Sequence, residues 1–174
     1  MRRLRDLALD ALQTALRLVP WSTDTGLRSV GDPGPGSPVL VTGNYALTVR
    51  RLLRALAGVD AWVVVAPSRG INVWCAASGG ILTTHQVVTA LKTSGVEERV
   101  SHRRAILPQL AATGVSAREL SRRSGWKARF GPVYAADIPR YLAGGASKTD
   151  EAVAVDDLEV LTRIYRRIAE AALA

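Results

Sequence analysis

Short apolar runs alternate with amphipathic segments through the middle of the chain. Residues 38–42 and 61–66 are almost continuously apolar, which is typical of strands buried on both faces of a parallel sheet. Residues 105–107 and 127–130 predict two further strands, and residues 71–74 form another short apolar run, just before a cluster of small residues. The pattern therefore predicts several short strands of one buried sheet.

Helical spacing of apolar residues fills the gaps between these runs. One helix is predicted over residues 45–56, another from Thr83 or Thr84 to the turn at Gly95, and a third over residues 116–124. Short strands that alternate with helices indicate an α/β fold. We therefore predict a Rossmann-like layered domain with a mainly parallel sheet.

Two more amphipathic helices are predicted near the ends of the sequence. Their apolar stripes cover residues 4–18 and 156–172, and a Gly/Pro-rich loop over residues 31–38 follows the first one. The predicted organisation is an N-terminal helix and linker over residues 1–30, an α/β domain over residues 31–150 and a C-terminal helix over residues 151–174.

Composition narrows the classes of function. A chain of 174 residues is long enough to bury a core without disulfides. Its single cysteine excludes an internal disulfide and any cysteine-built iron–sulfur cluster or zinc site within it, so electrons for a redox step must come from another protein. The net charge of +8 favours acidic partners. Because the arginines are scattered and no helix-turn-helix, zinc finger or aromatic platform is recognisable, nucleic-acid binding is not expected.

The first twenty residues do not have the pattern of a secretory signal. Asp6 and Asp10 interrupt the apolar region that such a signal requires. No stretch approaches the roughly 18 consecutive apolar residues of a membrane-spanning helix. We expect a cytoplasmic protein whose Arg-rich first helix can contact an anionic membrane surface peripherally.

Polar residues and glycines directly follow three of the predicted strands. They are Thr42-Gly43-Asn44 after the first, residues 67–70 after the second and Pro108-Gln109 after the strand at 105–107. In open α/β sheets, ligands bind outside the carboxyl ends of the strands. A ligand site is therefore expected at this edge.

The run Asn72-Val73-Trp74-Cys75-Ala76-Ala77 is a specific signature, and four weaker runs accompany it in order. These are residues 38–45, 107–110, 114–117 and 131–139. Together they resemble the corrinoid domain of the mercury-methylating corrinoid protein. More distantly, they resemble the large subunit of the corrinoid iron–sulfur protein of the acetyl-CoA pathway. The resemblance covers about residues 36–145.

The resemblance implies a corrinoid-binding domain with cobalamin as its cofactor and the Cys75 thiolate as the lower axial ligand of cobalt, in place of an imidazole. A soft thiolate donates strongly to such a metal. Ala76 and Ala77 would let the backbone approach the corrin ring, and Trp74 would supply an apolar wall. The implied and expected cofactor-binding residues are Thr42, Gly43, Asn44, Gly70, Asn72, Val73, Trp74, Cys75, Ala76, Ala77, Pro108, Gln109, Gly114 and Val115.

The function implied by the resemblance is that of a methyl carrier, a component of a methyltransferase system. Its expected partners are a methyl-donor protein and a ferredoxin-like iron–sulfur protein that acts as reductant. The sequence departs from the family after the signature: Ser78-Gly79-Gly80-Ile81-Leu82-Thr83-Thr84 replaces Gly-Lys-Gly-Thr-Phe-Gly-Thr. This departure motivates an alternative, a divergent corrinoid-binding module without catalysis, and the net charge motivates another, a basic adaptor protein.

Two other interpretations of Cys75 are open from residue type alone. A lone cysteine at the end of an apolar run is most often a buried and inert core residue. The thiol could instead be a nucleophile with His85 or His102 as its base. The exposure of the sulfur and the identity of its hydrogen-bond partners distinguish these interpretations.

Overall fold

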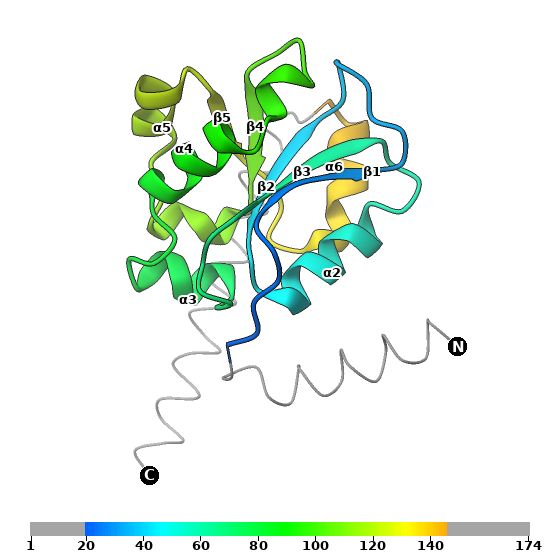
Figure 1. The fold of residues 1–174 in the computed structure, drawn as a ribbon. Coiled ribbons are helices and arrows are strands. Elements are labelled where there is room, and N and C mark those ends of the chain that lie inside the picture. The colour runs from blue at the N-terminus through cyan, green and yellow to red at the C-terminus, as the bar shows by residue number, and fades with distance from the viewer. Residues whose placement is uncertain (1–19, 146–174) are drawn as a thin grey trace, which may run out of the picture.

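The computed structural model describes residues 20–145, in which five strands form one sheet in the order β1-β3-β2-β4-β5 (Figure 1). β2 (Val39–Gly43) lies at the centre, between β3 (Ala61–Ala66) and β4 (Arg104–Leu107), and is parallel to both. β5 (Lys127–Phe130) lies parallel to β4, whereas β1 (Gly26–Val30) pairs antiparallel with β3. The sheet is therefore mainly parallel, as predicted.

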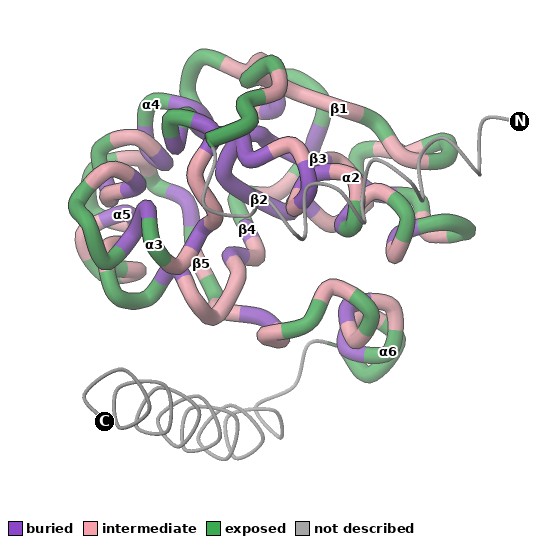
Figure 2. Tube along the Cα trace, turned by 90° about the horizontal axis from the view of Figure 1, so that it is seen from below, coloured by how far each residue is buried: buried purple, intermediate pink, exposed green. Residues whose placement is uncertain are grey.

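Helices cover both faces of this sheet. α4 (Thr84–Thr93) and α5 (Ala117–Ser124) lie over one face, and α2 (Ala46–Ala55) and α6 (Ile138–Ala143) lie over the other (Figure 1). Each face has its own hydrophobic core, represented on the first face by Leu91, Leu120 and Trp126 and on the second by Leu52, Val63 and Ile138. Figure 2 shows the buried segments of β2 and β3 between these two layers.

Burial on both faces explains the composition of the central strands. Every residue of β2 is buried, and Trp62 is the one residue of β3 that is half-buried. β5, an edge strand, instead alternates between exposed and half-buried residues. Continuous apolar runs are therefore confined to the strands that have helices on both sides.

The connections between strands reverse direction at the centre of the sheet. From β2 the chain passes through α2 to β3, then returns through α4 to β4 on the other side of β2, and continues through α5 to β5. In open α/β sheets a crevice forms at such a switch point, outside the carboxyl ends of the two strands that flank it. The fold therefore places a binding crevice at the ends of β2 and β4.

The predicted strands over residues 38–42, 61–66, 105–107 and 127–130 are confirmed, each within one residue of its predicted bounds. β1 was not predicted, because Arg28 and Ser29 interrupt its apolar pattern. The two terminal amphipathic helices lie outside the described residues. Within the described part of the chain, no helix combines the length and the apolar character that crossing a membrane requires.

The apolar run at residues 71–74 does not form a strand. It leads into a short helix, α3 (Val73–Ser78), with Asn72 as the N-cap. The backbone N–H of Cys75 donates to Asn72 Oδ1 at 3.0 Å, which satisfies one of the amides that the first helical turn leaves free. The capping bond explains why a helix begins at a position where the apolar pattern alone suggested a continuation of the strands.

Candidate functional site

Cys75 is exposed on α3, the helix that follows β3. Asn72 Nδ2 donates a hydrogen bond to Cys75 Sγ at 3.2 Å, while Asn72 Oδ1 accepts from Cys75 N at 3.0 Å. A backbone N–H can only donate, so Oδ1 must face it and the amide nitrogen must face the sulfur. Asn72 therefore holds the sulfur as a hydrogen-bond acceptor at the protein surface. The interpretation of Cys75 as a buried core residue is wrong.

The structure also gives no support to a cysteine–histidine nucleophile. The ring of His85 is hydrogen-bonded to Arg123 Nη2 at 3.1 Å. His102 lies with Nε2 at 3.0 Å from the Ser37 carbonyl oxygen, and its Nδ1 accepts from Arg104 N at 3.2 Å. Since the sulfur is bonded to Asn72 and both rings are engaged elsewhere, no imidazole is placed to take a proton from Cys75.

The other small residues of the signature point into the domain. Val73, Ala76 and Ala77 are buried, and α3 packs against η2 (Gln109–Thr113). A β-carbon at Gly114 would lie 2.5 Å from the Ala77 carbonyl oxygen. The backbone of α3 therefore lies close to Gly114, and the small buried side chains of α3 take part in this packing. Val115 is likewise buried in the core.

Asn44 ties the loop after β2 to the loop after β3. Its Oδ1 accepts from Ser68 N at 2.8 Å, from Gly70 N at 3.0 Å and from Ser68 Oγ at 3.1 Å. Its Nδ2 donates to the Thr23 carbonyl oxygen at 3.2 Å. The amide is therefore engaged inside the protein, where Asn44 positions the segment that leads to Cys75. Ser68, which is buried, belongs to the segment 67–70 that was expected at this edge of the sheet.

Two of the predicted glycines also serve close contacts within the protein. A β-carbon at Gly70, where φ is +67°, would lie 2.5 Å from Ser22 N, and one at Gly43 would lie 2.6 Å from Ser68 Oγ. The same atom at Gly43 would be 3.7 Å from Val73 Cγ2. Gly43 therefore lets the end of β2 lie against the loop before α3.

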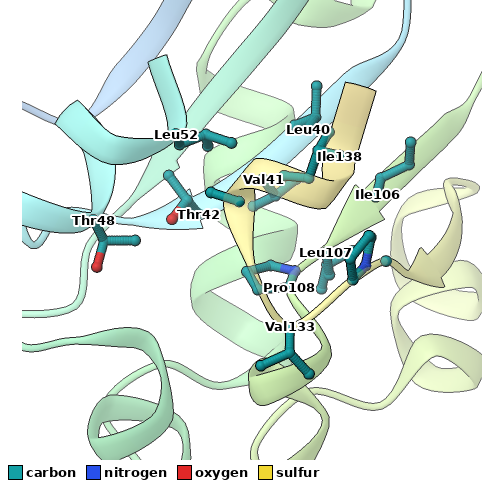
Figure 3. A pocket seen from close by; sticks show the side chains of 13 residues that line it. Leu40, Val41, Thr42, Thr48, Leu52, Ile106, Leu107, Pro108, Val133 and Ile138 are labelled. Atoms are coloured by element: carbon teal, nitrogen blue, oxygen red, sulfur yellow. The ribbon is translucent and has the colours of Figure 1, made fainter. Parts of the chain in front are cut away.

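A pocket of about 70 Å³ opens at the switch point of the sheet (Figure 3). β2, α2, β4 and the segment after β5 contribute to it, and its lining is mostly apolar. The lining residues are Leu40, Val41, Thr42, Thr48, Leu52, Ile106, Leu107, Pro108, Gly131, Pro132, Val133, Ala135 and Ile138. Thr42 and Pro108 were predicted, whereas the contributions of α2 and of residues 131–138 were not.

The hydroxyl of Thr42 is a buried polar group beside this pocket. Thr42 is 2% exposed and its Oγ1 has no hydrogen-bond partner among residues 20–145. Figure 3 shows the Thr42 side chain on the wall of the pocket, between Val41 and Thr48. A buried hydroxyl without a partner costs about 1–3 kcal/mol. This hydroxyl is therefore closed to solvent beside a pocket whose walls are mostly apolar.

The remaining predicted residues lie at the same edge of the sheet. Trp74 and Gln109 are both half-buried, the first on α3 and the second at the start of η2. In the described range 20–145, no group of three or more His, Cys, Asp or Glu side chains is arranged to hold a metal ion. The candidate site thus consists of an exposed sulfur on α3 and a largely apolar pocket beside β2 and β4.

Comparisons with known proteins cover this whole region. A family model described as CO dehydrogenase/acetyl-CoA synthase delta subunit matches residues 10–142. The acetyl-CoA decarbonylase/synthase complex subunit gamma of Archaeoglobus fulgidus is 34% identical over 125 residues, which are 71% of this chain and 26% of that protein. The subunit of the same name from Methanothermobacter thermautotrophicus is 34% identical over 131 residues, or 74% of this chain and 28% of its own length. The chain thus spans about a quarter of the length of these relatives.

Proposed function

Because the chain belongs to the family of the CO dehydrogenase/acetyl-CoA synthase delta subunit, we propose that it is a corrinoid-binding methyl carrier with Cys75 as the lower axial ligand of cobalt. The observation that carries this proposal is the exposed Cys75 sulfur, held as a hydrogen-bond acceptor by Asn72 at the carboxyl edge of the sheet. An accessible sulfur that is oriented to accept can act as a ligand, because the thiolate is the form that binds metals.

The surroundings of Cys75 fit a flat macrocycle. Ser78, Gly79 and Gly80, which follow on the same helix and in the next turn, are exposed and small, so bulky side chains do not flank the sulfur on that side. Trp74, which precedes Cys75 in the helix, is half-buried. The buried residues of α3 hold the helix against η2, so that the exposed sulfur is carried by a packed element.

The pocket at the switch point fits the rest of such a cofactor. A cobamide has an aromatic base on a side arm, and with Cys75 as the metal ligand this base would need a site of its own. We assign the base to the apolar pocket lined by Thr42, Leu52 and Ile106, at the same edge of the sheet.

A bound corrinoid would supply a cobalt centre that accepts and donates a methyl group. The residues of this chain would bind the ring, supply the axial sulfur and exclude water from its lower face. A soft thiolate raises the electron density at the metal, which favours transfer of the methyl group to an electrophilic acceptor. The mercury-methylating protein that the sequence also resembles suggests mercuric ion as one acceptor to test.

The partners follow from the same proposal. The relatives are named as subunits of an acetyl-CoA decarbonylase/synthase complex, so we propose that this chain works in an assembly of that kind with a methyl-donor protein. The chain has a single cysteine and cannot build an iron–sulfur cluster of its own. A separate ferredoxin-like protein is therefore proposed as the reductant.

Reconstitution with hydroxocobalamin tests the proposal. The full chain is incubated with the cofactor, separated by gel filtration and examined by visible spectroscopy, beside Cys75→Ala and the control Ser78→Ala on the exposed side of the same helix. We expect cobalamin to co-elute with the wild-type chain, with a spectrum that changes in Cys75→Ala and not in Ser78→Ala. Failure of cobalamin to co-elute would contradict corrinoid binding. Co-elution with an unchanged Cys75→Ala spectrum would contradict only the axial sulfur.

A further inference from the structure

We infer that Asn72 is a positioning residue for the metal ligand: its amide keeps the bond between Cys75 and cobalt weak enough to break when the metal is reduced. Asn72 would act on cobalt only through the sulfur. This inference rests on the proposed function, because it concerns the same sulfur. It goes beyond that function by assigning to one side chain the control of how strongly the sulfur binds.

The side chain of Asn72 contacts Cys75 twice. Its Oδ1 accepts from Cys75 N at 3.0 Å, and its Nδ2 donates to Cys75 Sγ at 3.2 Å. The first bond fixes the second, because an amide whose oxygen faces this backbone N–H turns its NH2 group toward the sulfur. The half-buried Asn72 thus holds a donor against a sulfur that is itself exposed.

Capping of α3 does not by itself require an asparagine. Serine and aspartate cap helices about as well, and Ser116 caps α5 by accepting from Glu119 N. What asparagine adds is an NH2 group beside the capping oxygen, in a fixed planar geometry. In α3 that group faces Cys75 Sγ. The contact with the sulfur therefore explains an asparagine at this position, whereas the helix cap alone does not.

A thiolate sulfur can accept this hydrogen bond and bind a metal at the same time, because it has three lone pairs. The two partners then compete for the same electron density. Hydrogen bonds to cysteine sulfurs are one of the means by which proteins tune the reduction potentials of blue-copper and iron–sulfur sites. The donor of Asn72 would in the same way lower the electron donation from Cys75 to cobalt.

Weaker donation matters because the metal must lose this ligand once in each cycle. Cobalt accepts a methyl cation only as cobalt(I), which holds no axial ligand. Two electrons from the proposed ferredoxin-like reductant convert cobalt(III) to cobalt(I), and the cobalt–sulfur bond breaks with its electron pair left on sulfur. The released thiolate keeps its hydrogen bond to Asn72 Nδ2, and hydrogen bonds to a charged group are stronger than neutral ones. Asn72 would thus stabilise the state in which the sulfur is free.

Three substitutions in the full chain test this role. Asn72→Asp keeps the capping oxygen and removes the donor, and Asn72→Gly removes the donor without adding charge. Ser78→Asp is the matched charge control, because it places a carboxylate on the exposed side of α3, three residues after Cys75, and leaves Asn72 in place.

Two quantities are measured for each variant. The potential of the cobalt(II)/cobalt(I) couple is obtained by spectroelectrochemical titration of the chain loaded with cobalamin. The rate at which iodoacetamide alkylates the cofactor-free thiolate is measured at alkaline pH, where this rate no longer changes with pH. The melting temperature without cofactor is measured in parallel.

We expect both Asn72 variants to have a lower potential than the wild type, so that cobalt(I) forms less readily. Their cofactor-free thiolate should be alkylated roughly two- to threefold faster, because a sulfur without the hydrogen bond is more nucleophilic. Ser78→Asp should have a smaller effect on both quantities. The melting temperature of Asn72→Asp should match that of the wild type, since its helix cap is kept. A change at the sulfur without a change in stability is not the result of a merely structural residue.

Other outcomes separate this inference from the proposed function. An unchanged potential or an unchanged alkylation rate in both Asn72 variants would overturn the role of Asn72. So would an effect of Ser78→Asp as large as that of Asn72→Asp, with none in Asn72→Gly. In these cases a spectrum of bound cobalamin that depends on Cys75 would leave the proposed function intact.

The proposed function fails first under a different set of results. If the wild-type chain binds no cobalamin, or if Cys75→Ala leaves the spectrum of bound cobalamin unchanged, the axial sulfur fails and the role of Asn72 fails with it. Should Asn72→Asp not fold, Asn72→Gly provides the same comparison with the wild type.

Discussion

Replacing Asn44 by alanine tests whether one buried amide holds the loop that leads to Cys75. The substitution removes the oxygen that accepts from Ser68 N at 2.8 Å and from Gly70 N at 3.0 Å. Ser68 Oγ has a single hydrogen, which lies within reach of both Asn44 Oδ1 and the Ile71 carbonyl oxygen, so in the variant it still donates to the Ile71 oxygen at 2.9 Å. Two backbone N–H groups are therefore left without a partner in the interior.

Each buried donor without a partner costs about 1–3 kcal/mol, so the two together lower the free energy of unfolding by about 2–6 kcal/mol, and we expect about 4 kcal/mol. That value is a large share of the roughly 5–15 kcal/mol that stabilises a typical domain. The matched control is Asn72→Ala, which removes another asparagine of the same site. Asn72 bonds to an exposed residue and caps a helix of only six residues. Because of this, Asn72→Ala should lower the free energy of unfolding by about 1 kcal/mol.

Urea denaturation followed by tryptophan fluorescence measures both variants. The midpoint for Asn44→Ala should fall well below that for Asn72→Ala, with the same dependence of stability on urea concentration. Asn44→Asp keeps an acceptor but loses the donor to the Thr23 carbonyl oxygen, so its urea midpoint should lie between those of Asn44→Ala and the wild type. If Asn44→Ala does not fold, Asn44→Asp takes its place in the comparison. Equal midpoints for Asn44→Ala and Asn72→Ala would refute the reasoning.

Two further predictions concern the packing of α3 and the state of its sulfur. Gly114→Ala should lower the free energy of unfolding by about 2–3 kcal/mol, because the added β-carbon would lie 2.5 Å from the Ala77 carbonyl oxygen and 2.7 Å from that of Leu82. The control is Gly36→Ala, because no atom lies within 4 Å of a β-carbon added at Gly36. Equal melting temperatures for Gly114→Ala and Gly36→Ala would contradict the close packing at Gly114. Cys75 should react fully with a thiol reagent in the native protein, since it is exposed, and a requirement for denaturant would show that its sulfur is buried.

The strands that are buried on both faces were predictable from the sequence. A strand such as β2 or β3 has no polar side, so its apolar run is continuous and visible in the sequence alone. The edge strand β1 was not predictable in this way, because its residues are only partly buried and its place depends on pairing with β3. A local apolar pattern reports burial, whereas strand pairing is a contact between distant parts of the chain.

The signature around Cys75 was likewise visible in the sequence, but the roles of its residues were not. Residue type could not distinguish an inert buried cysteine from an exposed one, nor show that Ala76 and Ala77 face the core. The same limit applies to Asn44, whose four hydrogen bonds join loops that are more than twenty residues apart.

The sequence by itself determined an α/β domain, its buried strands and the position of the single thiol, because these depend on composition and on short-range periodicity. Only the tertiary structure decided that the thiol is exposed and that Asn72 holds its sulfur. It also decided that Thr42 lies buried, with no partner for its hydroxyl in the described part of the chain, beside a pocket built from four separate segments. Exposure, hydrogen-bond partners and cavities arise from contacts between residues distant in sequence, and no local pattern encodes which of those contacts form.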